Sequence, residues 1–252
     1  MIPDYYTNLA PFEELFGTGL PVLTYHKVGP RPFNVRLKGM YMAPSLFDRQ
    51  LAELRGAGFA STSLGGVVGR DGNPDRRIAI TFDDGFANVL QNAAEPLARH
   101  RYKAIEFLVA YRIGQFNEWE IREGEAREPL MDMAQIKDWL AAGHEVGSHT
   151  LTHPMLTQIS PEQAREEIFD SKKSLEDLFG VPIRHFCYPY GDWNPALRDL
   201  VREAGYQTAS TTNPGVNHAA VSPFELKRMT ARHQTRSLKA LTARFFGTGV
   251  FA

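Results

Sequence analysis

Two adjacent carboxylates, Asp83 and Asp84, stand at the end of a short apolar run and are followed by Gly85. The run over residues 78–80 is typical of a strand buried on both faces. Because neighbouring side chains of a regular strand point to opposite faces, a turn at Gly85 is needed to bring both carboxylates to one cavity. Asp-Asp-Gly alone is a common turn, but the carboxyl ends of strands are where α/β folds build their sites.

A second stretch carries His149 and His153, four residues apart, a spacing suited to a shared metal ion. Pro154 disfavours a regular helix at His153 and favours a tight turn at the end of a strand. One carboxylate and two imidazoles make a three-ligand set that leaves room for water, which is typical of a catalytic zinc site.

A metal ion in such a set lowers the pKa of its bound water from about 15.7 toward about 7. The second carboxylate can then accept the proton of that water as a general base, and the nearby positive charge lowers its own pKa and keeps it ionised. The residues alone leave open which of Asp83 and Asp84 is the ligand and which is the base.

The composition limits the classes of partner. The chain has 252 residues, 43% of them hydrophobic, and a net charge of -1, which argues against nucleic acid as the main partner. Cys187 is the only cysteine, so an internal disulfide is excluded. No apolar run approaches the ~20 residues that span a bilayer. Residues 1–20 carry no basic residue, unlike a secretory signal, so a cytoplasmic location is expected by default, although removal of a signal would leave the same sequence.

Strands and helices are predicted to alternate along the chain without a break in composition, which favours one α/β domain over residues 1–252 with its core at about 20–235. Polar or aromatic candidates follow four predicted strand ends, and their convergence favours a barrel over a doubly wound sheet. These candidates are His26, the Asp83–Asp84 pair, His149 and Tyr190. The segments expected as strands are 21–25, 78–80, 104–110, 145–148, 185–188, 206–210 and 225–230; those expected as helices are 86–100, 132–142, 160–180, 194–205 and 238–246.

Two further segments carry local expectations. Ser45, followed three residues later by Asp48, resembles a capping box and predicts the start of a helix. Residues 112–129 are charged and irregular, and we expect a long loop that forms part of a lid or substrate rim. Three aromatic residues in or beside this loop, Tyr111, Phe116 and Trp119, are candidates for stacking on a sugar, although local packing is the commoner role of a loop aromatic.

The Asp-Asp stretch at residues 81–85 and the His-Thr-x-x-His stretch at 149–153 together resemble the polysaccharide deacetylases, the fourth carbohydrate esterase family. The resemblance covers residues 20–235 and implies a distorted seven-stranded (β/α) barrel that removes acetyl groups from N-acetylglucosamine units or, in some members, from acetylated xylan. It also implies that Asp83 is the general base and that Asp84, His149 and His153 bind Zn²⁺ or another divalent transition metal.

The third motif of that family normally reads Arg-x-Pro-Tyr or Arg-x-Pro-Phe, and here it is Cys187-Tyr188-Pro189-Tyr190. The resemblance implies that the backbone N–H of Tyr190 stabilises the oxyanion of a tetrahedral intermediate. The arginine, which contacts the base in the usual members, is absent. Cys187 stands in its place and is expected to be a small packing residue rather than a nucleophile.

The usual members take their general acid from a C-terminal histidine that an aspartate orients, and this chain shows no matching pair near its last predicted strand. His233, just beyond that strand, is a weak substitute. The stretch Leu23-Thr24-Tyr25-His26 instead resembles the start of the biofilm poly-N-acetylglucosamine deacetylases, in which the acid comes from the first strand. This resemblance implies that His26 protonates the leaving amine; a structural histidine is the alternative.

The sequence therefore predicts a metal-dependent hydrolase that removes N-acetyl groups from glycans containing N-acetylglucosamine. Two alternatives stay open: a small cyclic amide hydrolase of the same fold, and a catalytically inactive carbohydrate-binding domain. The expected partner is an acetylated glycan or oligosaccharide, and nothing in the sequence indicates an oligomeric state, the chain length of the glycan or the identity of the metal.

Overall fold

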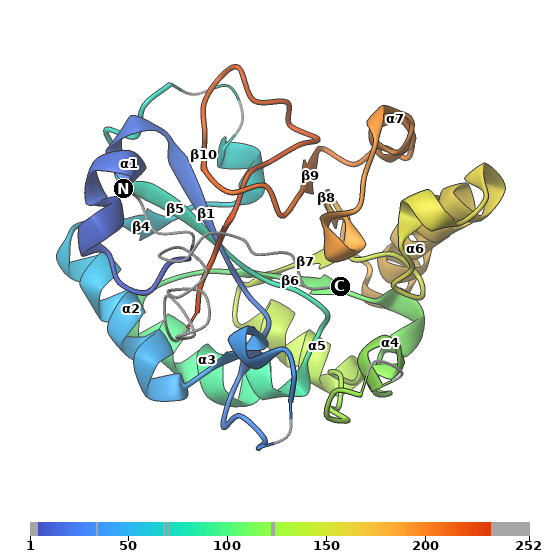
Figure 1. Ribbon diagram of the computed structural model, residues 1–252, viewed down its shortest axis with the longest axis horizontal. Helices are drawn as coiled ribbons and strands as arrows, with labels where there is room; N and C mark the ends of the chain where they lie inside the picture. The colour runs from blue at the N-terminus through green and yellow to red at the C-terminus, as the bar shows by residue number, and fades with distance from the viewer. Residues whose placement is uncertain (1–4, 34, 68, 70, 122–123, 233–252) are drawn as a thin grey trace, which may run out of the picture.

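A curled, mainly parallel sheet is surrounded by helices in the structure, a computed structural model that describes residues 5–33, 35–67, 69, 71–121 and 124–232 (Figure 1). The strands are β1 (Leu20–Tyr25), β2 (Lys27–Val28), β3 (Tyr41–Met42), β4 (Ala60–Ser61), β5 (Arg77–Phe82), β6 (Ile105–Leu108), β7 (Glu145–Ser148), β8 (His185–Cys187), β9 (Thr208–Ser210), β10 (Val216–Asn217) and β11 (Met229–Thr230). The α-helices are α1 (Glu13–Thr18), α2 (Pro44–Gly56), α3 (Ala87–His100), α4 (Glu118–Ile121), α5 (Met133–Ala141), α6 (Pro161–Phe179) and α7 (Pro195–Glu203).

The strand order makes the fold a distorted (β/α)7 barrel, as the sequence predicted. The main path of the sheet runs β10-β1-β5-β6-β7-β8-β9, with β11 paired to β1 and β4 paired to β5. The pairs along this path are parallel except β1–β10, and β2 and β3 form a separate two-stranded sheet. The carboxyl ends of β1, β5, β7 and β8 therefore meet at one end of the barrel.

Alternation along the strands divides the buried apolar residues into two clusters. The larger cluster includes residues such as Ile78, Ile80 and Phe82 of β5 and packs with helix residues such as Leu51 and Leu97. The smaller cluster has no α-helix residue and consists of Leu20, Val22, Leu64, Ala79, Ile105, Phe107, Cys187 and Leu226. Because successive strand residues point to opposite faces, the smaller cluster fills the inside of the barrel and the larger one joins its outer face to the helices.

Three helices begin with a side-chain cap at the residue where their predicted range begins. Asp132 and Ser160 each form a capping box with the glutamine three residues on, and Asn194 accepts from the backbone N–H of Leu197. The prediction of a capping box at Ser45 is wrong. Helix α2 begins one residue earlier, at Pro44, whose ring sets the first helical φ. Its cap, Ala43, has no side-chain acceptor.

Several elements differ from the predicted ranges. The strand expected at 225–230 is reduced to the two residues of β11, Met229–Thr230. Strand β10 was not predicted. Residues 112–129 hold the single turn α4, which the charged composition of that segment concealed. The helix expected at 238–246 and His233 lie outside the described residues. Among the described residues, no helix combines the length and the apolar character that crossing a membrane requires.

Candidate active site

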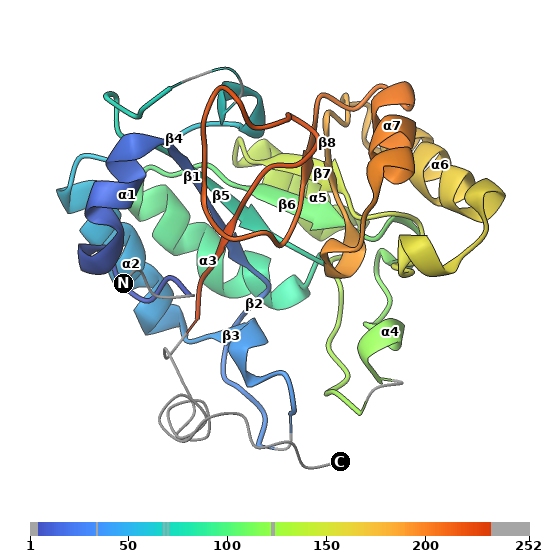
Figure 2. The ribbon, with the colours of Figure 1, turned by 45° about the horizontal axis from the view of Figure 1, so that its top comes forward.

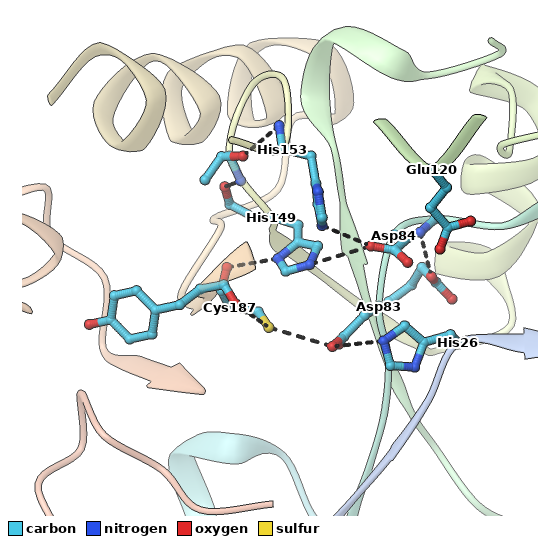
Figure 3. Close-up of polar contacts among 12 residues, drawn as sticks. His26, Asp83, Asp84, Glu120, His149, His153 and Cys187 are labelled. Atoms are coloured by element: carbon cyan, nitrogen blue, oxygen red, sulfur yellow. Dashed lines mark hydrogen bonds and ion pairs between the residues drawn. The ribbon is translucent and has the colours of Figure 1, made fainter. Parts of the chain in front are cut away.

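Asp83 and Asp84 leave the end of β5 in different directions. Residues 79, 81 and 83 share the inner register of the strand, so Asp83 points into the barrel, where Thr81 is also buried. Asp84 and Gly85 then adopt left-handed backbone conformations, with φ of 80° and 83°. This turn brings the second carboxylate to the barrel mouth beside the first, as the glycine predicted (Figure 3).

A buried glutamate braces this turn. The backbone N–H of Gly85 donates to Oε1 of Glu106 on β6, at 2.9 Å. Oε2 of Glu106 has no hydrogen-bond partner among the described residues, and burial raises the pKa of this carboxyl well above its ordinary value. Glu106 therefore serves the turn as the acceptor for the backbone N–H of Gly85, a role that the predicted strand at 104–110 did not reveal.

His149 and His153 lie on a tight turn directly after β7, as Pro154 predicted. Thr150 and His153 both have φ of 69°, and the backbone N–H of His153 donates to Oγ1 of Thr150. Glu167 of α6 accepts from two backbone N–H groups of the same turn, those of residues 151 and 152. These bonds compensate for the strained backbone and turn both imidazoles toward Asp84 (Figure 3).

Three ligand atoms converge at the mouth of the barrel. Oδ1 of Asp84 lies 3.4 Å from Nε2 of His149 and 3.2 Å from Nε2 of His153, and all three atoms lie within 4.8 Å of one another. Ligand atoms bound about 2.0–2.1 Å from a tetrahedral metal are separated by about 3.3 Å. Nδ1 of His149 must donate to the carbonyl of Cys187, 2.8 Å away, because a carbonyl only accepts. Burial alone would lower the pKa of His149, but without a metal ion Cys187 and Asp84 raise it. Once Nε2 gives up its proton to a metal ion, its lone pair points toward the ligand position.

The donor set therefore fits a divalent cation. All three side chains are buried, and the two imidazoles hold the pKa of Asp84 well below its ordinary value although burial alone would raise it. The carboxylate is consequently in the ionised form that a metal ligand requires.

A second group of possible ligands, Asp83, His149 and Cys187, lies next to the first. Both carboxylate oxygens of Asp83 are already bonded to a guanidinium, whose positive charge repels a cation. Burial also raises the pKa of the Cys187 thiol, whereas a metal ligand must be a thiolate. The chemistry of the donors favours the set that contains Asp84.

Arg228 holds Asp83 and was missed by sequence reasoning. Its Nη1 donates to Oδ1 and its Nη2 to Oδ2 of Asp83, each at 2.8 Å, and Nη2 also lies 3.1 Å from Sγ of Cys187. Burial alone would raise the pKa of Asp83, but the buried guanidinium outweighs it and lowers this pKa below the ordinary value. The third motif has no arginine to contact the carboxylate of Asp83. Arg228, which directly precedes β11, makes this contact instead.

The remaining candidates line the same mouth. Nε2 of His26, directly after β1, lies 3.8 Å from Oδ2 of Asp83, and burial lowers the pKa of this imidazole despite the two aspartates. The Tyr190 ring is half exposed, and its centroid lies 4.6 Å from that of His153. Trp119, brought by α4, stacks on the ring of His153, also with 4.6 Å between centroids and with an interplanar angle of 23°. The structure thus brings together the six predicted catalytic and metal-ligating residues, which are His26, Asp83, Asp84, His149, His153 and Tyr190.

The paired aspartates and the histidine pair lie at the carboxyl end of the strands, where α/β barrels build their active sites. A family model described as polysaccharide deacetylase matches residues 70–209, more than half of the chain. The chain belongs to the polysaccharide deacetylase family, as its two motifs predicted.

Individual relatives cover different shares of the chain. YxkH of Bacillus subtilis is 26% identical over 216 residues, which are 83% of this chain and 70% of that protein. The peptidoglycan-N-acetylglucosamine deacetylase of Bacillus cereus is 30% identical over 154 residues. That alignment covers 57% of this chain, and the chain spans only 64% of the length of that relative.

Solved structures share the fold. IcaB from Ammonifex degensii superposes with a TM-score of 0.71 at 25% identity, over 85% of this chain and 92% of that one. The deacetylase PplD of Streptococcus pyogenes superposes with a TM-score of 0.73 at 23% identity, over 88% of this chain and 96% of that one. These similarities support the barrel assignment made from the order of the strands.

Proposed function

We propose that this chain is a metal-dependent N-deacetylase that acts on glycans containing N-acetylglucosamine. The observation that carries the proposal is the spacing of the Asp84, His149 and His153 ligand atoms beside an ionised Asp83. The class of substrate is supported by the names of two relatives, the peptidoglycan-N-acetylglucosamine deacetylase of Bacillus cereus and the chitooligosaccharide deacetylase of Azorhizobium caulinodans.

Asp84, His149 and His153 would hold the cation, for which zinc suits a donor set of one oxygen and two nitrogens. When bound, such a cation supplies positive charge that polarises the amide carbonyl and acidifies water. The chain itself supplies the groups that bind the substrate and move the protons.

Asp83 is the general base of the proposed reaction. Its carboxylate is ionised at neutral pH, and Arg228 fixes both oxygens at the inner edge of the ligand set. The proton of the attacking water passes to this carboxylate as the water oxygen bonds to the acetyl carbon. The backbone N–H of Tyr190 is proposed to stabilise the negative oxygen that develops on the acetyl group.

His26 is proposed to protonate the leaving amine. Because burial lowers its pKa, the imidazole is mainly neutral at neutral pH, and the proton that it delivers must be collected during the reaction. Asp83 is the nearest source, with 3.8 Å between Oδ2 and Nε2 of His26, a distance that can shorten when substrate binds. One proton then moves from water to Asp83 to His26 to the amine nitrogen as the C–N bond breaks.

The test is acetate release from chitooligomers, poly-N-acetylglucosamine, peptidoglycan and acetylxylan, with and without a chelator. We expect release from at least one of the N-acetylated glycans, its loss with chelator and its recovery on addition of Zn²⁺. Asp83→Asn should bind the metal but lose turnover. Saccharide binding without acetate release would instead support a carbohydrate-binding domain, and turnover by Asp83→Asn at the wild-type rate would refute the assignment of the base.

A further inference from the structure

The two histidines of the ligand set are oriented by different means. The ring of His149 is fixed by the hydrogen bond from its Nδ1 to the carbonyl of Cys187. Nδ1 of His153 is buried and has no hydrogen-bond partner among the described residues. Because metal-ligating histidines usually rely on a hydrogen bond at the second nitrogen for their orientation, His153 needs another restraint.

Two aromatic rings contact the imidazole of His153, whose Nδ1 has no hydrogen-bond partner among the described residues. The Trp119 ring lies nearly parallel to the imidazole, with 4.6 Å between centroids, and the Tyr190 ring meets it nearly edge-on at the same distance. A ring enclosed in this way loses most of its freedom to rotate. Trp119 comes from α4, a single turn too short to be stable alone, so something else must hold it in place.

A buried ion pair holds α4 to the first strands. Nζ of Lys27 lies 2.6 Å from Oε2 of Glu120, the residue after Trp119, and neither side chain is more than 6% exposed. The ammonium also lies 4.4 Å from the centroid of the Phe86 ring and 4.9 Å from that of Tyr41. A buried ammonium requires a partner, and Glu120 is the anion that it contacts.

Glu120 also organises its own segment. Nδ2 of Asn117 donates to the same Oε2 at 2.7 Å and to the carbonyl of Ala126, while its Oδ1 accepts from the backbone N–H of Glu128. The carboxylate of Glu120 faces that of Asp84 (Figure 3), and Lys27 offsets the repulsion between the two negative groups. Figure 2 shows the α4 segment and the β2–β3 segment, which begins at Lys27, projecting from the same end of the barrel.

We propose that Trp119 is a positioning residue for the metal ligand His153, and that the Lys27–Glu120 ion pair holds the turn that carries it. The inference rests on the proposed function, since it assigns His153 to a metal. It gives the 112–129 segment a role in the metal centre in addition to any contact with glycan. It also joins the segment after β1, which carries His26 and Lys27, to the ligand set through one buried pair.

The experiment measures the affinity of the metal-free protein for Zn²⁺ by competition with a chromophoric chelator. Trp119→Ala should bind Zn²⁺ about tenfold more weakly, the usual size of such an outer-shell effect, and Trp119→Phe should recover most of the affinity. Glu120→Gln should weaken binding in the same direction. The matched control is Asp177→Asn, which removes a carboxylate from the exposed Lys173–Asp177 pair and should have no effect.

The combined variant Trp119→Ala/Glu120→Gln decides whether the ion pair acts through the tryptophan. We expect it to bind no more weakly than Trp119→Ala alone, whereas a full additive loss would overturn the link. If Glu120→Gln does not fold, Lys27→Met/Glu120→Leu replaces it, because apolar substitution of a whole buried pair is often tolerated. We again expect weaker Zn²⁺ binding, and no further loss when Trp119→Ala is added. Unchanged affinity in Trp119→Ala would refute the inference alone, whereas absence of Zn²⁺ binding by the wild type would refute the proposed function.

Discussion

Replacing Arg228 by glutamine tests how this chain keeps its general base ionised. The two hydrogen bonds from Arg228 to Asp83, both 2.8 Å, lie in a buried site where at most 5% of either side chain is exposed. Burial of Asp83 raises its pKa and the guanidinium lowers it, with a net decrease. Glutamine removes the positive charge but leaves an amide donor, so the pKa of Asp83 should rise.

The size of the effect follows from the separation of the charges. An opposite charge in contact lowers the pKa of a carboxyl group by about 1–3 units, or about 1.4–4 kcal/mol. Two unit charges about 4 Å apart in a medium of effective dielectric about 20 interact by about 4 kcal/mol, which agrees with the upper end. The acidic limb of kcat/KM against pH should therefore move upward by about 1–3 pH units in Arg228→Gln.

The sign of the shift distinguishes this role from a structural one. A base must be unprotonated to act, so a raised pKa lowers activity at mildly acidic pH and lets it recover at higher pH. The assay is acetate release from pH 4.5 to 9 at equal metal loading, with the exposed Arg184→Gln as control. A uniform loss of activity with an unmoved acidic limb would refute the reasoning.

Two further substitutions separate the roles assigned around Asp83. His26→Gln should lower kcat on an acetylated amino sugar by about 10²–10⁴-fold, the usual contribution of a general acid. Hydrolysis of an aryl acetate should be nearly unchanged, because an aryloxide leaves without a proton. Equal losses on both substrates would contradict the acid role. Cys187→Ala should still bind one equivalent of Zn²⁺ in a titration and should release acetate at a rate within a few-fold of the wild type. Loss of the metal would indicate instead that it is bound by the neighbouring set of Asp83, His149 and Cys187.

Local chemistry made much of the barrel predictable. Apolar runs located the principal strands, and the side chains of Asp132, Ser160 and Asn194 marked three helix starts within a residue. Short elements were harder to predict. The two residues of β10 carry no periodic pattern, and α4 is stabilised by tertiary contacts rather than by helix propensity.

The two motifs identified four of the six candidate residues, and the third motif and the stretch 23–26 supplied Tyr190 and His26. The contacts that tune these residues are long-range. Arg228 meets Asp83 across 145 residues of sequence because β11 pairs with β1, with Leu23 opposite Met229. Lys27 and Glu120 are 93 residues apart and look like two solvated charges when read locally. One signal was available: an arginine beside a strand, in a chain whose third motif lacks one, deserved testing as the partner of the base.

The most direct test of the metal centre is calorimetric titration of the metal-free protein with Zn²⁺, comparing wild type with Asp84→Asn. The account predicts one equivalent bound by the wild type and a loss of at least tenfold in affinity for Asp84→Asn, because a neutral amide replaces the one anionic ligand. Equal binding by the two proteins, or no binding by the wild type, would contradict the claim that Asp84, His149 and His153 hold a metal ion.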